Sequence, residues 1–241
     1  ERCIARCIES VLGAVDEIVV LDTGSTDRTL EILARYPEVK VFHTEWKDDF
    51  SAARNEALSV VTGDWVFWID ADQTLHPEDR PKLKIAAGLL NGITKPAAYV
   101  TGEIHTNRSK EQAVYSTIRF FPTRFSLRYW GRVHEQVGAA EGLGAVRLVG
   151  RTLGIRVYHD GYEPSVVERK RKLDRNIRLL KEMVREEPDH PGWRLFLGRE
   201  TIAAGDDDEA LVHLIEAERS AAACPSFARI IDIYRYQFEI Y

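Results

Sequence analysis

Two aspartates, Asp70 and Asp72, stand one residue apart directly after the apolar run VFWI at 66–69. Charge is costly to bury without compensation, so these carboxylates must either emerge into a turn or hold a cation. On extended backbone, side chains two residues apart project to the same side. Two hard oxygen ligands with open positions suit Mg²⁺ or Mn²⁺, with phosphate oxygens completing the coordination. Aspartate is also a common turn former and helix cap, so the Asp-x-Asp pattern alone leaves both interpretations open.

A third carboxylate, Asp22, ends the β-branched run EIVVLD at 17–22 and precedes a Thr-Gly-Ser-Thr turn. Open α/β sheets bind ligands beyond the carboxyl ends of their strands. If the strands at 17–22 and 65–70 are parallel neighbours, Asp22 and the two later aspartates converge on one rim. Asp22 can equally serve as a turn former that caps with Ser25. Both roles can hold together, because a cap leaves one carboxylate oxygen able to accept another hydrogen bond.

The elements that position these aspartates alternate along the chain from residue 1 to about 160. Strand-like runs at 39–44 and 65–70 enclose a helical pattern that starts with Asp49 or Ser51 as N-cap and ends at Gly63. Alternation of this kind predicts an α/β fold with a mostly parallel sheet sandwiched by helices. After residue 97, short runs with Gly, Pro and polar breaks predict an irregular, partly antiparallel extension of the sheet.

From about residue 163 the pattern is helical to the end of the sequence. Several small or apolar residues fall where a helix–turn–helix repeat of about 34 residues places its packing positions. They are Trp193, Leu197, Gly198, Gly205, Ala210, Leu214 and Ala217. Such helices cannot bury their apolar faces alone, so we expect them to dock on the α/β domain. The sequence therefore predicts two domains, at 1–162 and 163–241.

Composition narrows the function classes. The net charge of −5 and the pI of about 5.9 argue against nonspecific binding to nucleic acid or anionic lipid. No apolar segment approaches the ~18 residues that a membrane span requires, and no signal peptide is visible. Cys3 and Cys7 are too isolated from other cysteines or histidines to complete a tetrahedral metal site. We expect them and Cys224 to be buried free thiols, as suits the reducing cytoplasm.

Spaced motifs across residues 16–162 resemble the family 2 glycosyltransferases. The matching segments are DEIVVLDTGSTDRT (16–29), WKDDFSAARNEAL (46–58), GDWVFWIDAD (63–72), WGRVHEQV (130–137) and HDGY (159–162). These enzymes have a GT-A fold, invert the configuration of the transferred sugar and use nucleotide-diphospho sugars. The likeness is greatest to the bacterial branch in which tetratricopeptide helices follow the catalytic domain. The family's first strand would precede Glu1, so we expect that strand to be missing from this sequence.

The resemblance implies a nucleotide-sugar site. Asp22 would contact the uracil or ribose of the donor, and Asp70 would lie near the ribose and the diphosphate. Arg54 would sit on a helix close to the donor. It can instead pair with Asp48 or Asp49 at the surface, and the sequence does not choose between these roles.

The resemblance also implies a metal site and a base. Asp72 would bind the divalent cation, Mn²⁺ or Mg²⁺, and His159 would complete the site. Inversion at an anomeric carbon requires a base on the face opposite the leaving group. Glu135 falls where these enzymes place their acidic base. His134 is the alternative, and it points to the opposite face if this run is extended.

The sequence thus predicts a metal-dependent inverting glycosyltransferase that moves a hexose from a nucleotide-diphospho sugar, expected to be a UDP-sugar. The acceptor is an unidentified glycan, peptide or protein, and no nucleic acid partner is expected. The alternative is a catalytically weak or inactive transferase domain that serves as a protein- or peptide-binding module through its helical tail. The sequence sets no oligomeric state.

Overall fold

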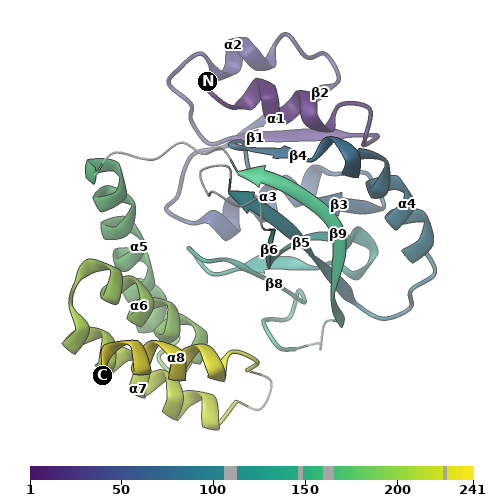
Figure 1. Ribbon diagram of the computed structural model, residues 1–241. Helices are drawn as coiled ribbons and strands as arrows, with labels where there is room; N and C mark the ends of the chain where they lie inside the picture. Colours follow the sequence, from purple (N-terminus) through teal and green to yellow (C-terminus); the bar gives the residue numbers. More distant parts are fainter. Residues whose placement is uncertain (106–112, 146–148, 160–165, 225–226) are drawn as a thin grey trace. The chain divides into compact units, whose positions relative to one another are not determined.

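A computed structural model describes residues 1–105, 113–145, 149–159, 166–224 and 227–241 of the chain (Figure 1). The chain forms two compact units. Unit 1 comprises Glu1–Lys47, Ala52–Trp130 and Gln136–Tyr162. Unit 2 comprises Asp48–Ser51, Gly131–Glu135 and Glu163–Tyr241. The domain boundary predicted between 162 and 163 lies outside the described residues, as do residues 160–162 of the HDGY motif.

Unit 1 contains both helices and strands, as an α/β domain requires. In chain order they are α1 (Ile4–Val11), β1 (Ile18–Asp22), α2 (Thr29–Leu33), β2 (Val39–His43), α3 (Phe50–Val60), β3 (Trp65–Phe67), β4 (Gln73–Leu75), η1 (Pro77–Asp79), α4 (Arg80–Leu90), β5 (Ala97–His105), β6 (Val114–Pro122), η2 (Thr123–Phe125), β7 (Arg128–Trp130), β8 (Gln136–Gly138) and β9 (Val149–His159). The first two residues of α3 belong to unit 2.

The N-terminal layer of unit 1 is a parallel pair, β1 and β2, packed against α1 and α2 (Figure 1). The buried residues of α1 recur at three- and four-residue steps, which gives the helix one apolar face. Ile4 and Ile8 from that face pack with Leu33 of α2 and with Val20 and Val41 of the two strands. The alternation of strand and helix that the sequence predicted for this region is confirmed.

The main sheet of unit 1 has five strands in the order β3-β6-β5-β9-β4. β5 and β9 are parallel, whereas β3 with β6, β5 with β6 and β4 with β9 are antiparallel. The α/β class and the antiparallel extension after residue 97 are confirmed. The prediction that the sheet is mostly parallel does not hold for the described pairings. Only residues 106–113 lie between β5 and β6, fewer than the dozen or so that a parallel crossover requires, so these two strands pair antiparallel.

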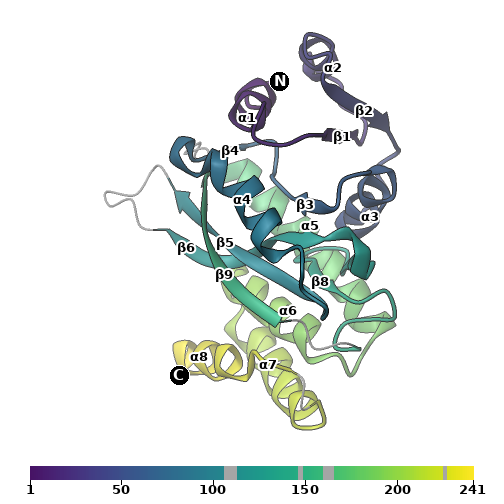
Figure 2. The ribbon, with the colours of Figure 1, turned by 90° about the vertical axis from the view of Figure 1, so that its right-hand side faces the viewer.

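Both faces of the main sheet are covered, as its strand pattern requires. Phe120 and Phe121 are adjacent on β6, yet they belong to different buried clusters on opposite faces. The cluster around Phe120 contains Leu83 of α4, and the cluster around Phe121 contains Tyr129 of β7, with Leu58 of α3 packed against it. Figure 2 shows α4 and α3 beside the strands that they cover. The predicted arrangement of a sheet sandwiched by helices is therefore confirmed.

The strands that carry Asp22 and the later aspartates are not hydrogen-bonded neighbours. β1 pairs with β2 in a separate two-stranded sheet, and β3 is an edge of the main sheet next to β6. The predicted rim of adjacent parallel strands is therefore wrong for the described residues. α1 packs at this junction, because Val11 contributes to the cluster under the main sheet while Ile4 and Ile8 cover β1 and β2.

Unit 2 is helical, with α5 (Val166–Glu186), α6 (Pro191–Ala204), α7 (Asp207–Ala222) and α8 (Ile230–Ile240). The predicted packing positions are confirmed. Trp193, Leu197, Ala210, Leu214 and Ala217 are all buried. Gly198 lets α6 and α7 approach closely, because a Cβ there would lie 2.8 Å from Leu214 Cγ. Gly205 ends α6 in the left-handed conformation, with φ of 85°.

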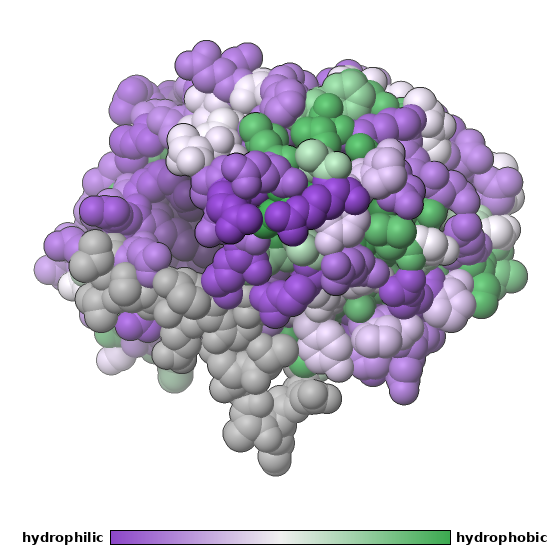
Figure 3. Space-filling model, turned by 90° about the horizontal axis from the view of Figure 1, so that it is seen from above, coloured by the Kyte–Doolittle hydropathy of each residue, from purple (hydrophilic) through white to green (hydrophobic). Residues whose placement is uncertain are grey.

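The surface carries no continuous apolar face in the view of Figure 3. Hydrophilic residues predominate there, and hydrophobic residues lie in separate patches. Exposed large hydrophobic side chains of unit 1 lie on several elements, for example Leu30 on α2, Leu89 on α4 and Tyr115 on β6. Among the described residues, no helix combines the length and the apolar character that crossing a membrane requires.

A buried ion pair ties the start of α4 to β9, the strand that ends at His159. Asp79 is fully buried, and its carboxylate accepts hydrogen bonds from the backbone N–H of Arg156 at 2.8 Å and from Arg156 Nε at 2.7 Å. Lys82 completes the pairing. Burial acts to raise the pKa of Asp79, but the hydrogen bonds from Arg156 and Lys82 lower that pKa to about 2.

We expect Asp79→Asn to lower the free energy of unfolding by about 3 kcal/mol, because Arg156 loses its buried charged partner. Folding lowers the pKa of Asp79. The contribution of this carboxylate to the free energy of unfolding is therefore complete at pH values above its ordinary pKa of 3.8, and it is lost as the pH falls through about 2. Urea denaturation should therefore give a constant difference from wild type near neutral pH and a shrinking one in acid.

The matched control is Asp16→Asn. Asp16 pairs with Lys84, also on α4, but its side chain is 89% exposed. Its loss should cost at most about 0.5 kcal/mol. Equal effects of the two substitutions would contradict the role assigned to Asp79.

Candidate functional site

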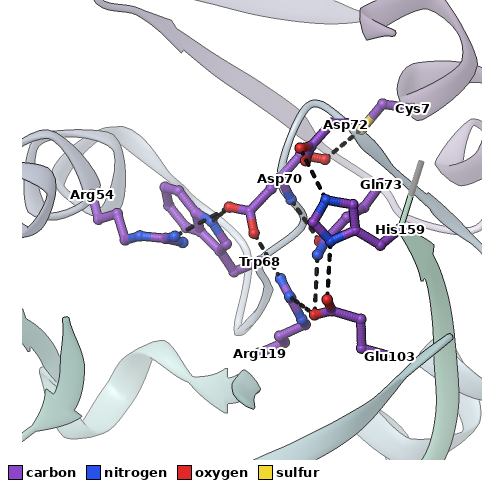
Figure 4. Close-up of polar contacts among 9 residues, drawn as sticks. All are labelled: Cys7, Arg54, Trp68, Asp70, Asp72, Gln73, Glu103, Arg119 and His159. Atoms are coloured by element: carbon purple, nitrogen blue, oxygen red, sulfur yellow. Dashed lines mark hydrogen bonds and ion pairs between the residues drawn. The ribbon is translucent and has the colours of Figure 1, made fainter. Parts of the chain in front are cut away.

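Asp70 and Asp72 lie on a β-turn that follows β3. The backbone N–H of Trp68 still donates to the Arg119 carbonyl at 2.7 Å, as a strand residue would. The N–H of Gln73 then donates to the Asp70 carbonyl at 2.9 Å, which closes the turn. The expected extended backbone is therefore wrong at these residues. The turn lets the two carboxylates contact different partners (Figure 4).

Asp70 faces two arginines. Its Oδ1 accepts hydrogen bonds from Arg54 Nη2 and from Trp68 Nε1, both at 3.1 Å. Its Oδ2 accepts from Arg119 Nη1 at 3.2 Å. The backbone N–H of Asp70 donates to Gln73 Oε1 at 3.1 Å. These contacts hold the carboxylate in one orientation, with its side chain 37% exposed.

α3 delivers Arg54, which the sequence placed on a helix near the donor or in a surface pair. The guanidinium lies over the Trp68 ring at 4.4 Å and over the Tyr129 ring at 5.1 Å from the ring centres. Asn55, the next residue on α3, bonds both the N–H and the carbonyl of Tyr129 at 2.8 Å. This pair of hydrogen bonds between α3 and β7 fixes the position of the helix that presents Arg54 to Asp70.

Arg119 joins Asp70 to a second carboxylate, that of Glu103, whose side chain is 16% exposed. The Arg119 side chain is only 3% exposed, and its Nη2 donates to Glu103 Oε2 at 2.9 Å. Gln73 Nε2 donates to the same oxygen at 3.3 Å. Arg119 lies on β6 and Glu103 on β5, two strands that pair directly. A guanidinium this deeply buried needs both carboxylates as partners.

His159 lies between Glu103 and Asp72 at the end of β9. Its Nδ1 is 3.0 Å from Glu103 Oε1, and its Nε2 is 3.3 Å from Asp72 Oδ2. The hydrogen bond with Asp72 and then that with Glu103 raise the pKa of His159 to about 10. The hydrogen bond with His159 lowers the pKa of Glu103 to about 2 despite its burial. In this state the imidazole is charged and bridges the two carboxylates.

Six side chains thus form one line of alternating charge, drawn in Figure 4. In order they are Arg54, Asp70, Arg119, Glu103, His159 and Asp72. The structure brings together four residues that the sequence singled out, namely Arg54, Asp70, Asp72 and His159. The two aspartates of the Asp-x-Asp pattern are therefore linked through a continuous network.

The residues fit a divalent cation in one respect. A ligating histidine usually gives its second nitrogen to a carboxylate, which orients the ring. Glu103 holds Nδ1 of His159 in this way, and Nε2 faces the half-exposed carboxylate of Asp72. Within the described ranges, no group of three or more His, Cys, Asp and Glu side chains is arranged as a metal site. Asp72 and His159 can supply two ligands, so a cation would need the rest from phosphate oxygens and water.

Cys7 forms a hydrogen bond with the turn that carries Asp70 and Asp72. Its thiol donates to the Asp70 carbonyl at 3.5 Å, and burial, with the nearby carboxylates, raises its pKa to about 12. The three cysteines are free, as expected. Only Cys7 is fully buried, whereas Cys3 and Cys224 are partly exposed, so the expectation of buried thiols fails for those two.

Asp22 acts as the turn former that its sequence context suggested. Its carboxylate accepts hydrogen bonds from the backbone N–H groups of Gly24 and Ser25 at 3.2 Å, and His43 Nδ1 lies 3.6 Å away. Burial acts to raise the pKa of Asp22, but hydrogen bonds from Ser25 and Gly24 hold it below its ordinary value. These backbone hydrogen bonds favour the ionised carboxylate at the end of β1.

Glu135 and His134 belong to unit 2, whereas the other predicted site residues belong to unit 1. They follow β7 in the short segment Gly131–Glu135. His134 Nε2 is 2.8 Å from Glu200 Oε1 of α6, and the two nitrogens of its ring lie 2.9 and 3.1 Å from Arg199 Nη2. His134 has φ of 53°, so the segment is not the extended run that the sequence suggested.

Sequence analysis missed two members of the network, Glu103 and Arg119. It also missed Trp68 and Gln73, whose side chains form hydrogen bonds with the network. One signal was available: Arg119 stands inside the apolar strand run TIRFFP, where an arginine needs a buried partner. Glu103 is the partner, but β5 and β6 pair with two register shifts, so no sequence spacing identifies it.

Comparison with known proteins agrees with this architecture. Residues 1–138 match the model of the family described as glycosyl transferase family 2. That match covers more than half of the chain, so the chain belongs to the family 2 glycosyltransferases. The predicted family resemblance is confirmed.

Two curated relatives have matching regions of different length. SunS of Bacillus subtilis strain 168, an SPbeta prophage-derived glycosyltransferase, is 33% identical over 218 residues, which cover 88% of this chain and 49% of SunS. A TPR repeat-containing protein of Synechococcus elongatus is 39% identical over 135 residues, which cover 56% of this chain and 32% of that protein. The chain spans about half the length of SunS and less of the second relative.

Solved structures share the fold. Crystal structures of S. aureus TarS residues 1–349, alone and with UDP-GlcNAc, superpose with TM-scores of 0.52 and 0.55. Their sequences are 15% and 16% identical to this chain, and the matches cover 99% of it and 87% and 88% of TarS 1–349. This likeness confirms the GT-A-like fold.

We expect Arg119→Met to destabilise the protein by about 3 kcal/mol, because Glu103 and Asp70 lose the cation that they share while Glu103 stays buried. Chemical denaturation measures the change. Arg128→Met is the control, because Arg128 is an exposed arginine on neighbouring β7 and its loss should cost no more than about 0.5 kcal/mol. A change below 1 kcal/mol for Arg119→Met would contradict the central role given to this residue.

Proposed function

We propose that this chain carries out donor binding and catalysis in a metal-dependent inverting glycosyltransferase that moves a hexose from a UDP-sugar to an acceptor. One observation carries the proposal. Asp72 and His159 lie 3.3 Å apart at the end of a charged network, and Glu103 holds the other nitrogen of His159. Paired oxygen and nitrogen donors with a supporting carboxylate are what a divalent cation needs beside a diphosphate.

The donor is inferred from the family and from the fold. TarS, whose fold this chain shares, has been crystallised with UDP-GlcNAc. We assign Asp70 to the ribose and diphosphate side of the donor, with Arg54 beside it at 3.1 Å. Asp22 is assigned to the uracil or ribose. Its carboxylate is ionised and buried at a strand end, and it can accept a further hydrogen bond from the base or sugar.

The cation is Mn²⁺ or Mg²⁺, held by Asp72 and His159 in this proposal. When bound, it neutralises charge on the departing diphosphate. As a ligand, His159 would have to be neutral, because a protonated imidazole has no lone pair to give to a cation. Glu103 keeps the ring orientation through Nδ1 in either state.

Glu135 is the proposed base. The acceptor, a hydroxyl, amine or thiol of unidentified origin, gives its proton to the Glu135 carboxylate as it attacks the anomeric carbon. A bond forms between the acceptor atom and that carbon. The bond from the anomeric carbon to the diphosphate oxygen breaks on the opposite face, and its electron pair leaves with UDP. The configuration at the anomeric carbon is inverted.

The contacts of His134 favour Glu135 over His134 as the base. A base must have a lone pair directed at the proton that it takes. The Nε2 of His134 lies 2.8 Å from Glu200 Oε1 and 2.9 Å from Arg199 Nη2, so it is engaged within unit 2. These contacts support a structural role for His134 and leave the proton transfer to Glu135.

Asp72→Asn tests the cation site. We expect Mn²⁺-dependent hydrolysis of UDP-GlcNAc, measured as released UDP, to fall roughly 100-fold because one anionic ligand is lost. Titration calorimetry should show UDP binding that no longer responds to Mn²⁺. Asp64→Asn, at an exposed aspartate before β3, should behave as wild type. Equal hydrolysis by wild type and Asp72→Asn would refute the cation assignment.

Glu135→Gln tests the base. We expect the hydrolysis rate at saturating UDP-GlcNAc to fall roughly 100-fold to 10,000-fold, while the dissociation constant for UDP with Mn²⁺ stays unchanged. His134→Gln measures the alternative base in the same assay. A wild-type protein that binds neither UDP nor UDP-GlcNAc in calorimetry would instead support the inactive, protein-binding alternative.

A further inference from the structure

The segment that bears the proposed base is built into the helical unit. Gly131–Glu135 joins β7 to β8, two strands that belong to unit 1, yet its packing assigns it to unit 2 with the four C-terminal helices. The contacts of three of its residues with α5 and α6 explain this assignment.

Gly131 lies against the core of the helical unit. Its φ is 98°, a conformation that favours glycine. A Cβ at this position would come within 2.9 Å of Trp193 on α6 and 3.1 Å of Met183 on α5. Both of these side chains are buried. The backbone at Gly131 therefore lies so close to α5 and α6 that there is no room for a side chain at this position.

Arg132 ties the segment to α5 and to the start of α3. Its Nη2 pairs with Glu186 Oε1 at 2.7 Å, and its carbonyl accepts a hydrogen bond from the backbone N–H of Phe50 at 2.9 Å. The neighbouring Asp48 pairs with Arg178 of α5 at 2.9 Å. Two segments distant in sequence thus attach to the same helix.

His134 is held by a polar cluster on α6. Its φ of 53° is unusual for a residue with a side chain, and such a conformation persists only where the surroundings enforce it. Glu200 accepts from His134 Nε2 at 2.8 Å and from Arg199 Nη2 at 2.8 Å, and the Phe196 ring lies 5.1 Å from the imidazole. Asn176 of α5, itself 4% exposed, donates to the second oxygen of Glu200 at 3.4 Å.

Glu135 follows His134 directly, so the contacts that hold His134 limit where the Glu135 carboxylate can lie. The charge of Arg175 on α5 is within reach of this carboxylate. Burial lowers the pKa of Arg175, and the carboxylates of Asp48, Glu135 and Glu200 oppose that shift.

We infer that the helical unit positions the base of the transferase, with Glu200 as the positioning residue that holds Glu135 through His134. The inference rests on the proposed role of Glu135. A general base works only within hydrogen-bond reach of the proton that it takes, and a misplacement of about 1 Å can cost roughly 100-fold in rate. The tetratricopeptide-like helices then hold the segment that carries the base, in addition to any partner that they bind.

Glu200→Gln tests this role, because it keeps the shape of the side chain and removes the charge that holds His134. We expect UDP release from UDP-GlcNAc at saturating donor to fall roughly 10-fold to 100-fold, with an unchanged dissociation constant for UDP in the presence of Mn²⁺. Glu209→Gln is the matched control. Glu209 also pairs with a cation of α5, Lys181 at 2.8 Å, but it lies outside this cluster, and its loss should leave the rate unchanged.

Hydrogen–deuterium exchange provides a readout that needs no turnover. In Glu200→Gln, amides of residues 131–135 should exchange roughly 10-fold faster than in wild type, while those of α7 stay unchanged. Gly131→Ala should give the same local loss of protection, because its Cβ displaces the segment from Trp193 and Met183.

The outcomes separate this inference from the proposed function. Faster exchange at 131–135 together with a lower rate and unchanged UDP affinity supports it. A wild-type rate in Glu200→Gln overturns it, and so does a lower rate without faster exchange. If the wild-type protein neither binds nor hydrolyses UDP-GlcNAc, the proposed function fails. Separately, unchanged amide exchange at residues 131–135 in both Glu200→Gln and Gly131→Ala would show that the helices do not hold the segment.

Discussion

The buried guanidinium of Arg119 is the constraint on which unit 1 depends. A charge that is 3% exposed must be paired, and its two partners come from different parts of the chain. Asp70 lies on the turn after β3, and Glu103 lies on β5. Glu103 in turn holds His159 at the end of β9, and His159 faces Asp72. One buried cation therefore joins the turn, strands β5 and β6 and, through Glu103, the imidazole of His159, whereas Asp22 stands apart from this network at the end of β1.

A second constraint acts in the helical unit. The chain approaches Trp193 and Met183 so closely at Gly131 that no side chain fits, and His134 is held in a left-handed conformation by Glu200. Both constraints act on Gly131–Glu135, the segment that lies between β7 and β8 of unit 1 in the sequence. The compact units of the protein are thus interleaved along the chain.

Local patterns predicted most elements, because they depend on neighbouring residues. The helical pattern between its predicted cap residues marked α3, and the small residues of the repeat marked where α6 and α7 touch. The partnership of strands was harder to predict. β1 and β3 look equivalent in sequence, yet β1 pairs with β2, while β3 pairs antiparallel with β6. Pairing over such distances is decided by which faces the whole domain can bury, and no short pattern records it.

The sequence by itself determined the α/β and helical halves and the family, and it singled out Arg54, Asp70, Asp72 and His159 as candidate site residues while leaving the role of Arg54 open. These follow from residue types, local periodicity and motifs that can be read along the chain. Only the tertiary structure decided that a turn separates the two aspartates, that Arg119 and Glu103 join them, and that Glu135 belongs with the helices. Each of these depends on a buried charge or a close backbone approach, and the partner in such a contact is chosen by packing between residues far apart in the sequence.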